Sequence, residues 1–241
     1  MLPAGIVIRP PIFDPIAAYG ISGIAILVAI IWVVLFSQHN SGRALVLAIT
    51  VIVLMALSAM AALSGQLSRF DSFPPPMLTM IASVFILSFS VGLSSFGRNA
   101  AANLSFAALV GFQSFRLPLE LLMHHAGTVG IMPEQLSYSG YNFDIVTGLT
   151  ALLLLVALKL GMPVPRSLLW SWNLWGWLCL VVIAIIAITT SPVVRAFGDE
   201  PQNLNTWVLY FPYVWLPVVL VTAAISGHVI IARKLLAGAD S

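Results

Sequence analysis

The chain of 241 residues is 60% hydrophobic and only 7% charged, with a formal net charge of +2. A soluble domain carries about 25% charged residues, so this composition excludes an ordinary soluble protein and indicates an all-α, polytopic membrane bundle. The ten Lys and Arg residues form no basic tract, which argues against a nucleic-acid partner. At about 20 residues per span, residues 1–241 form one transmembrane domain with no room for a separate soluble domain.

The first residues, MLPAGIVIRPP, contain no basic segment that runs directly into a short apolar core. We therefore expect no cleaved signal peptide, and the first span stays in the mature chain. Apolar runs bounded by charged residues, Pro and Gly predict seven transmembrane helices. Their predicted ranges are 16–37, 43–65, 75–97, 103–125, 143–161, 167–190 and 206–232.

The basic residues predict an outer N-terminus and an inner C-terminus. Seven spans in that orientation place six basic residues inside and three outside, in agreement with the positive-inside rule. If the fourth segment did not cross, four of the inner residues would move to the outer side. The inner residues are Arg43, Arg98, Lys159, Arg166, Arg233 and Lys234, and the outer residues are Arg9, Arg69 and Arg195.

The fourth predicted span carries ionisable side chains within an apolar stretch. Helical spacing places Gln113, Arg116, Glu120 and His124 on one stripe. A charge at membrane depth costs roughly 2.5–3.5 kcal/mol, so the stripe must face the bundle interior or a water-filled cavity. Pro118 predicts a kink beside the charges. Two interpretations stay open: a ligand-binding or proton-handling centre, and an Arg116–Glu120 salt bridge that only fixes helix packing.

Residues of two other spans are candidates to join this stripe. Asp144 opens the fifth span, where it either joins the cluster or, like Asn142, caps the helix. Tyr210 and Tyr213 lie towards the outer rim of the seventh span, on the same predicted face as His228; interfacial anchoring is their alternative role. The predicted ligand-binding set is Arg116, Glu120, His124, Asp144, Tyr210 and Tyr213.

The sequence predicts no cofactor and no bound metal. At 1.5 Å per residue, His124 lies about 15 Å above the middle of its predicted span and His228 about 13 Å below the middle of its own, so no single haem iron binds both. Glu120, His124 and Asp144 could form an intramembrane acid–base or metal-assisted enzyme as an alternative. No Gly-x-Ser-x-Gly, His-Glu-x-x-His or phosphate-loop motif occurs to support catalysis.

Four strings, FRLPLELLMHH, YNFDIVTGLTA, SWNLWGW and NTWVLYFPYVWLP, resemble a family of bacterial multispan proteins that are described only as hypothetical. The resemblance covers residues 100–235. It implies a location in the bacterial cytoplasmic membrane, and it implies no activity, cofactor or catalytic residue.

The residues favour a non-enzymatic bundle that binds or passes a small polar or anionic solute through an outward-facing cavity. In this hypothesis Arg116 attracts the anion, and Glu120 orients Arg116 or carries a proton. The first alternative is a structural or accessory subunit whose apolar faces contact a membrane-protein partner or a second copy. The expected partners are therefore the lipid bilayer, the small polar or anionic solute, and a membrane protein or a second copy of the chain.

Overall fold

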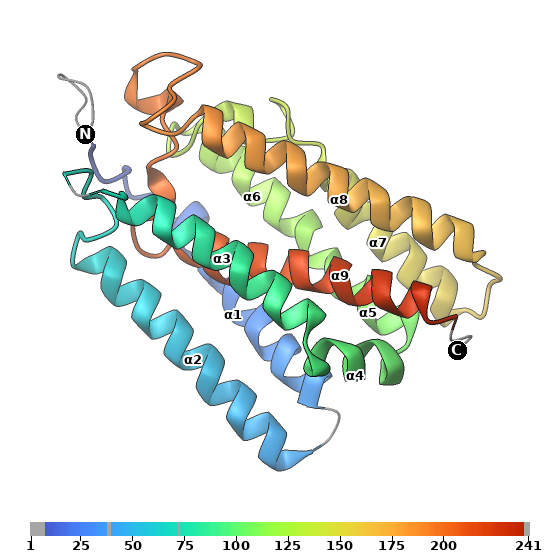
Figure 1. Cartoon of the computed structure of the whole chain (residues 1–241). Coiled ribbons are helices and arrows are strands. Elements are labelled where there is room, and N and C mark those ends of the chain that lie inside the picture. The colour runs from blue at the N-terminus through green and yellow to red at the C-terminus, as the bar shows by residue number, and fades with distance from the viewer. Residues whose placement is uncertain (1–7, 38–39, 72, 239–241) are drawn as a thin grey trace.

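The computed structural model describes residues 8–37, 40–71 and 73–238. Every regular element in these ranges is helical. The long helices lie side by side with their axes roughly aligned, and the short helix α4 lies near one end of the bundle (Figure 1). The α-helices are α1 (Pro15–Ser37), α2 (Ser41–Leu63), α3 (Pro76–Leu93), α4 (Ser95–Asn103), α5 (Phe106–Phe112), α6 (Arg116–Thr128), α7 (Asp144–Lys159), α8 (Arg166–Thr189) and α9 (Thr222–Leu236).

Six segments in the described ranges are long and apolar enough to cross a membrane. They are α1, α2, α3, α8, the continuous pair α5–α6, and the segment that ends with α9. The predicted span 143–161 corresponds to α7, which has 16 residues. At 1.5 Å per residue α7 is about 24 Å long, less than the roughly 30 Å of a hydrocarbon core. The all-α class is confirmed, and six helices could cross a membrane by length and composition, whereas the seventh span and the orientation are not confirmed.

Side-chain caps explain where several helices begin. Asp14 Oδ1 accepts a hydrogen bond from the backbone N–H of Ala17 at 2.8 Å at the start of α1. Asn40 Oδ1 accepts from the N–H of Arg43 at 2.8 Å at the start of α2, and Ser105 caps α5 in the same way. These oxygens bind N–H groups that the first turn of a helix leaves without partners.

The fourth predicted span consists of two helices. A 3₁₀ turn, Gln113–Phe115, separates α5 from α6. Pro118 explains the interruption because its nitrogen cannot donate to the carbonyl of Ser114, one turn earlier. The α-helix is therefore interrupted beside the position of the predicted kink, and Arg116 becomes the first residue of α6.

The last helical segment begins later than the prediction of 206–232. It runs from Leu216 to Leu236 and opens with a π-helical turn, Leu216–Val221, directly before α9. The residues before it form a 3₁₀ turn, Trp207–Leu209, and irregular backbone. Pro212 lies in this apolar run and disfavours helical backbone at the residue before it.

This later start changes the positions of three predicted side chains. Tyr210 and Tyr213 precede the helical segment, so the prediction that they share a helical face with His228 is wrong. His228 lies two residues from the centre of its segment, about 3 Å along the axis rather than about 13 Å. Hydropathy alone does not separate a buried apolar loop from an apolar helix, which explains the error.

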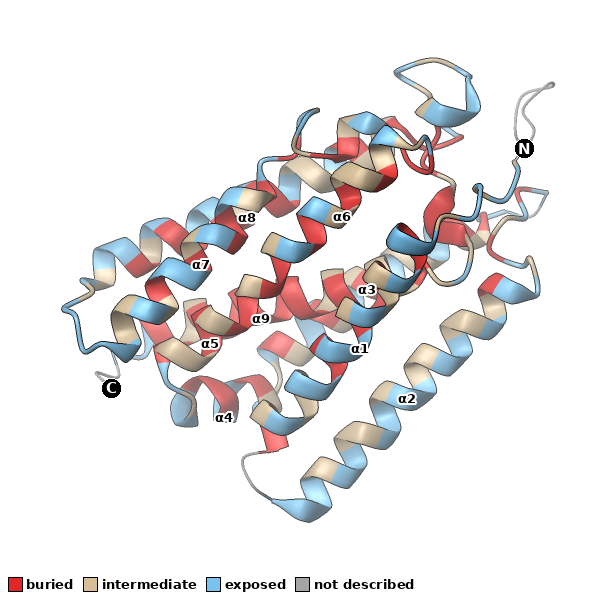
Figure 2. Cartoon of the chain, turned by 180° about the vertical axis from the view of Figure 1, so that it is seen from behind, coloured by how far each residue is buried: buried red, intermediate tan, exposed pale blue. Residues whose placement is uncertain are grey.

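Helix α9 is the centre of the bundle and α2 is its periphery. α9 packs against α3, α4, α5 and α8, and Figure 2 shows that it is mostly buried. α2 packs against α1, and both views show it standing apart from the other helices (Figures 1 and 2). The indole of Trp215 donates from Nε1 to the carbonyl of Met55 at 3.1 Å, which ties α2 to the segment before α9.

Close packing of α6 against α7 depends on Gly148, which generates a first prediction. A Cβ atom at this position would overlap the backbone nitrogen of Leu117 and lie 2.9 Å from the carbonyl carbon of Arg116. Because backbone atoms cannot move aside as a flexible side chain can, we expect Gly148→Ala to destabilise the fold by roughly 1–3 kcal/mol. Thermal unfolding in one detergent measures the difference.

Gly23→Ala is the matched control, because a Cβ atom there would meet nothing within 4 Å. Alanine is the better helix former by roughly 1 kcal/mol, so this variant should be neutral or slightly more stable than the wild type. Equal unfolding midpoints for the two variants would contradict the close contact between α6 and α7.

Candidate functional site

Arg116 is the centre of a buried polar network that joins four helices. Its guanidinium lies at the start of α6, and the residue is 1% exposed. Arg116 Nε lies 2.7 Å from Asp144 Oδ2 of α7, and Nη1 lies 2.9 Å from His228 Nε2 of α9. His228 Nδ1 in turn lies 2.8 Å from Asn173 Oδ1 of α8.

Hydrogen-bond chemistry fixes the protons of this network. A guanidinium has only donors, so His228 Nε2 must accept the hydrogen bond from Arg116. The imidazole proton then lies on Nδ1, which donates to the amide oxygen of Asn173. The histidine is therefore neutral in this arrangement, and its tautomer is set by a cation on one side and an amide on the other.

A second carboxyl group joins the network through Asn142. The amide nitrogen of Asn142 donates to Glu120 Oε2 at 2.8 Å and to the carbonyl of Leu136 at 3.0 Å. Its amide oxygen accepts from the backbone N–H of Asp144 at 3.0 Å. Asn142 thus connects both carboxyl-bearing residues to the loop between α6 and α7. Glu120 and Asp144 are both buried.

This network forms one wall of an otherwise apolar cavity of about 140 Å³. The cavity lies between α3 and α8, which both pack against α9, and Figure 1 shows these two helices on either side of α6 and α9. The segment between α8 and α9 lines one end of the cavity. The polar residues that line it are Arg116, Glu120, Asp144 and Asn205, with the indole of Trp207.

Several buried polar atoms of the cavity wall have no hydrogen-bond partner among the described residues. They include the Nη2 donor of Arg116, the amide oxygen of Asn205 and the indole N–H of Trp207. A buried polar group without a partner costs roughly 1–3 kcal/mol. The wall therefore offers donors and an acceptor to a molecule that enters the cavity.

The structure brings together three of the six predicted site residues and separates the other three. Arg116, Glu120 and Asp144 line the cavity. His124 lies in the last part of α6, where its ring stacks on Tyr138 of the following loop with ring centroids 4.3 Å apart. The cavity-lining residues include neither His124 nor the two predicted tyrosines, Tyr210 and Tyr213.

Tyr210 and Tyr213 belong to the irregular segment before the π-helical turn. Tyr213 is 3% exposed, and its ring packs against Trp207 with ring centroids 5.0 Å apart. Tyr210 is half-buried against the same apolar cluster. Both side chains therefore stabilise the segment that covers the cavity.

Two expectations about pairing are corrected. Arg116 forms its ion pair with Asp144 on the neighbouring helix, rather than with Glu120 one turn along α6. Asp144 does not cap α7, because its carboxylate turns to the guanidinium, and the amide oxygen of Asn142 accepts from the first N–H of the helix instead. The prediction paired Arg116 with Glu120 because residues four apart on one helix can neutralise each other. A buried guanidinium instead needs partners in several directions, which other helices supply.

The enzyme alternative required Glu120, His124 and Asp144 to act together. In the structure, His124 Nδ1 lies 3.2 Å from Ser139 Oγ in the loop between α6 and α7, and the two carboxyl groups lie in the cavity wall. Within residues 8–37, 40–71 and 73–238, no three His, Cys, Asp or Glu side chains are grouped so that they could hold a metal ion.

The Arg116–Asp144 pair generates a second prediction. Asp144→Asn leaves a guanidinium that is almost fully buried without its counter-charge, and removing one partner of a buried pair costs roughly 3–5 kcal/mol. Asp199→Asn is the control, because Asp199 is paired with Arg195 at the surface and such pairs contribute at most about 1 kcal/mol. Unfolding titrations in mixed micelles compare the variants.

The double variant Arg116→Met, Asp144→Leu separates lost charge balance from lost packing. We expect it to be more stable than Asp144→Asn, because apolar side chains of similar size remove both buried charges together. A double variant that is less stable than the single one would show that the pair contributes through its own attraction, contrary to this prediction.

The comparisons with known proteins place the chain in a family without assigning a function. A family model described as a domain of unknown function, DUF8737, matches residues 73–236, from the start of α3 to the end of α9. No curated protein and no solved structure matches the chain. The match covers more than half of the chain and includes every residue of the Arg116 network. The chain belongs to the DUF8737 family, as the resemblance to an uncharacterised family predicted.

Proposed function

We propose that this protein is a non-enzymatic membrane protein that binds or passes a small, partly apolar solute in the cavity between α3 and α8. One observation carries the proposal: a guanidinium and two carboxyl groups line a cavity of about 140 Å³ inside a helical membrane bundle. Ionisable groups at membrane depth are rare, and they mark solute and ion pathways when they face a cavity.

The charges of the cluster favour a neutral or cationic polar group on the solute. Arg116 carries one positive charge, and Asp144 lies against it at 2.7 Å. Glu120 is a second carboxyl group in the same wall. A neutral cluster therefore needs one further positive charge, which is either a proton on Glu120 or a cationic group of the solute. Arg116 alone suggested an anion, and its pairing with Asp144 weakens that expectation.

The remaining wall sets the shape of the solute. Apart from its polar end, the cavity is lined by aliphatic and aromatic side chains of α3, α6, α8 and the segment that ends with α9. An apolar cavity with a few convergent polar groups is typical of small-molecule sites. We expect a solute with a short apolar body and one polar head that reaches Arg116 and Glu120.

Three six-carbon probes test this proposal: hexylamine, hexanol and hexanoate. They have the same apolar body and carry a cationic, a neutral and an anionic head. We expect hexylamine or hexanol to raise the unfolding temperature of the purified protein more than hexanoate does. At ten times its Kd, such a ligand would stabilise the fold by about 1.4 kcal/mol. If hexylamine raises the unfolding temperature more than hexanol does, Glu120→Gln should remove that difference.

Ala187→Trp and Ile185→Trp are the control pair for these probes. Ala187 lines the cavity, whereas Ile185 is 55% exposed on the same helix. A filled cavity should abolish stabilisation by the probes in Ala187→Trp only. Equal probe effects in both variants would reject the cavity as the site. A closed, ligand-free site would then favour the accessory-subunit alternative, in which the Arg116 network only bridges helices.

We also propose that α7 crosses the membrane, giving seven spans with an outer N-terminus. α7 packs against α5, α6 and α8, and it connects the outer loop after α6 to the opposite end of the bundle, where α8 begins (Figure 1). The described basic residues near the end of the bundle where α9 ends outnumber those near the end where α1 begins. This asymmetry supports the orientation by the positive-inside rule.

Cysteine labelling tests this topology. Cys179 is the single cysteine and is buried, so Cys179→Ser gives a background for Glu134→Cys before α7 and Met162→Cys after it. We expect a membrane-impermeant maleimide to label Glu134→Cys in intact cells and Met162→Cys only after permeabilisation. Labelling of both in intact cells would show that α7 does not cross, and the reverse pattern would invert the orientation.

A further inference from the structure

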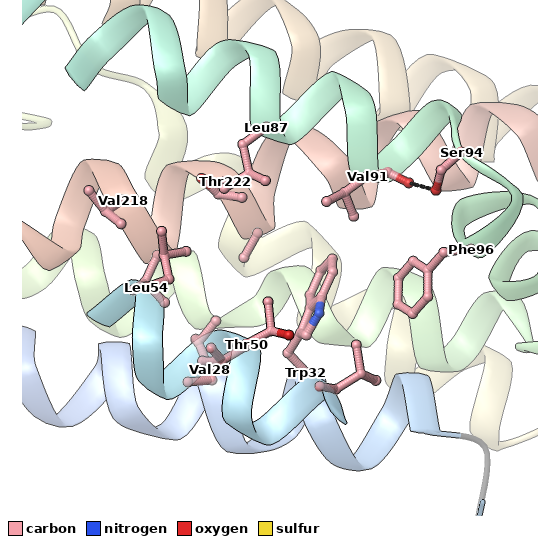
Figure 3. A pocket seen from close by; sticks show the side chains of 15 residues that line it. Val28, Trp32, Thr50, Leu54, Leu87, Val91, Ser94, Phe96, Val218 and Thr222 are labelled. Atoms are coloured by element: carbon pink, nitrogen blue, oxygen red, sulfur yellow. Dashed lines mark hydrogen bonds between the residues drawn. The ribbon is translucent and has the colours of Figure 1, made fainter. Parts of the chain in front are cut away.

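A second region of the bundle has features of a ligand site. A groove lies between α2 and the rest of the bundle. Its first part is a cavity of about 200 Å³. In Figure 3, Thr50 and Leu54 of α2 face Leu87 and Val91 of α3 across this cavity. Its floor is formed by α1 and by the segment that ends with α9.

The groove continues towards the end of the bundle where α2 ends and α3 begins. A further cavity of about 250 Å³ lies next along α2 and α3. Leu54, Leu87 and Val218 line both cavities, so the two parts are continuous. From Leu47 to Ala61 the groove follows α2 for about 21 Å at 1.5 Å per residue, which exceeds the roughly 15 Å of hydrocarbon in one leaflet.

The opposite end of the groove opens into a polar pocket of about 210 Å³. Arg43 of α2 and the pair Ser95 and Asn99 of α4 line this pocket. Phe96 lines both the pocket and the apolar groove, and its ring stacks on Trp32 with centroids 6.4 Å apart. The order along the bundle is therefore a polar pocket with a cation, then aromatic rings, then an apolar groove.

The charges around the pocket have one sign. The sequence contains no Asp or Glu between residues 15 and 70, nor between 72 and 119, so α1, α2, α3 and α4 carry no carboxylate. Arg43 and Arg98 lie at this end of those helices. A basic pocket beside membrane helices is the chemistry that recognises an anionic lipid headgroup.

The order of polar and apolar surfaces selects a lipid as the occupant. A cation lies at one end, and about 21 Å of apolar wall follows along α2. An anionic headgroup followed by an acyl chain has the same order.

We infer that this groove binds an anionic phospholipid, with the phosphate-bearing headgroup at Arg43 and an acyl chain between α2 and α3. The site is separate from the cavity of the Arg116 network and does not depend on the function proposed for it. The lipid comes from the leaflet on the Arg43 side, which is the cytoplasmic leaflet in the orientation proposed above.

Native mass spectrometry of the delipidated full-length protein tests this inference. The probes are dioleoyl phosphatidylglycerol and dioleoyl phosphatidylcholine, which share their acyl chains and differ in headgroup charge. We expect the wild type to bind phosphatidylglycerol at least tenfold more tightly. Arg43→Gln should weaken phosphatidylglycerol binding about fivefold and leave phosphatidylcholine binding unchanged.

Two matched controls accompany these variants. Arg69→Gln changes an exposed arginine in the loop that follows α2, away from the polar pocket, and should have no effect on either lipid. Leu87→Trp fills the groove and should weaken the binding of both lipids, whereas Ile86→Trp, on a residue 68% exposed on the same helix, should not. Size-exclusion profiles establish that each variant is folded, and Arg43→Gln tests the site even if Leu87→Trp does not fold.

Three outcomes would overturn the assignment. The first is equal binding of the two lipids, and the second is an equal loss in Arg43→Gln and Arg69→Gln, which would indicate unspecific attraction. The third is a lipid-free dimer that dissociates in Leu87→Trp, which would assign the groove to a second copy of the chain.

Discussion

The buried guanidinium of Arg116 is the constraint on which the arrangement of the bundle depends. A cation at membrane depth has neither water nor lipid to bind, so the protein must supply its partners. Asp144 and His228 supply them from two other helices, and Asn173 orients His228 from a third. The positions of α6, α7, α8 and α9 around one another therefore follow from the donors of a single side chain.

Small residues surround this network and make it geometrically feasible. A Cβ atom on Gly176 of α8 would overlap the imidazole of His228, and one on Gly227 of α9 would overlap the amide of Gln113. Small residues let membrane helices approach closely and hydrogen-bond across their interface. The glycines are thus matched to polar side chains on the facing helix, which explains why they occur beside the network.

Irregular backbone borders the cavity of the Arg116 network. The 3₁₀ turn Gln113–Phe115 directly precedes Arg116, and the π-helical turn Leu216–Val221 directly precedes α9. Residues from or beside both turns line the cavity. Interrupted membrane helices expose backbone groups and are tolerated where they face protein or a cavity, and π-helical turns are frequent at functional sites. The backbone and the side chains therefore indicate the same region independently.

The sequence predicted one side of the site well and the other side poorly. Arg116 and Glu120 could be found because their spacing in an apolar run is visible without a structure. Asp144 was placed among the candidates because it opens a span, although its pairing with Arg116 is a tertiary contact that no local pattern encodes. His228 was missed for a different reason: the apolar segment before Leu216 shifted the predicted centre of its span.

Asn173 illustrates a limit that better span boundaries would not remove. It lies among tryptophans whose spacing is typical of an interfacial belt, and its role depends on His228, which is 55 residues away in the chain. A polar residue cannot be recognised from the sequence as part of a site when its hydrogen-bond partner has not been identified. A buried guanidinium needs acceptors, which leads from Arg116 to His228, and the remaining imidazole proton of His228 leads on to Asn173.

Helix α3 links the two cavities physically, because it lies between them. Met80 and Val84 line both the cavity of the Arg116 network and the groove along α2. A molecule that widens one cavity by displacing α3 would narrow the other. Two large occupants would therefore weaken each other's binding. Occupants that fit without displacing α3 would bind independently. Two sites are coupled only where an occupant distinguishes two positions of a shared element. In this bundle that element is α3, which packs against α9 and borders the groove along α2.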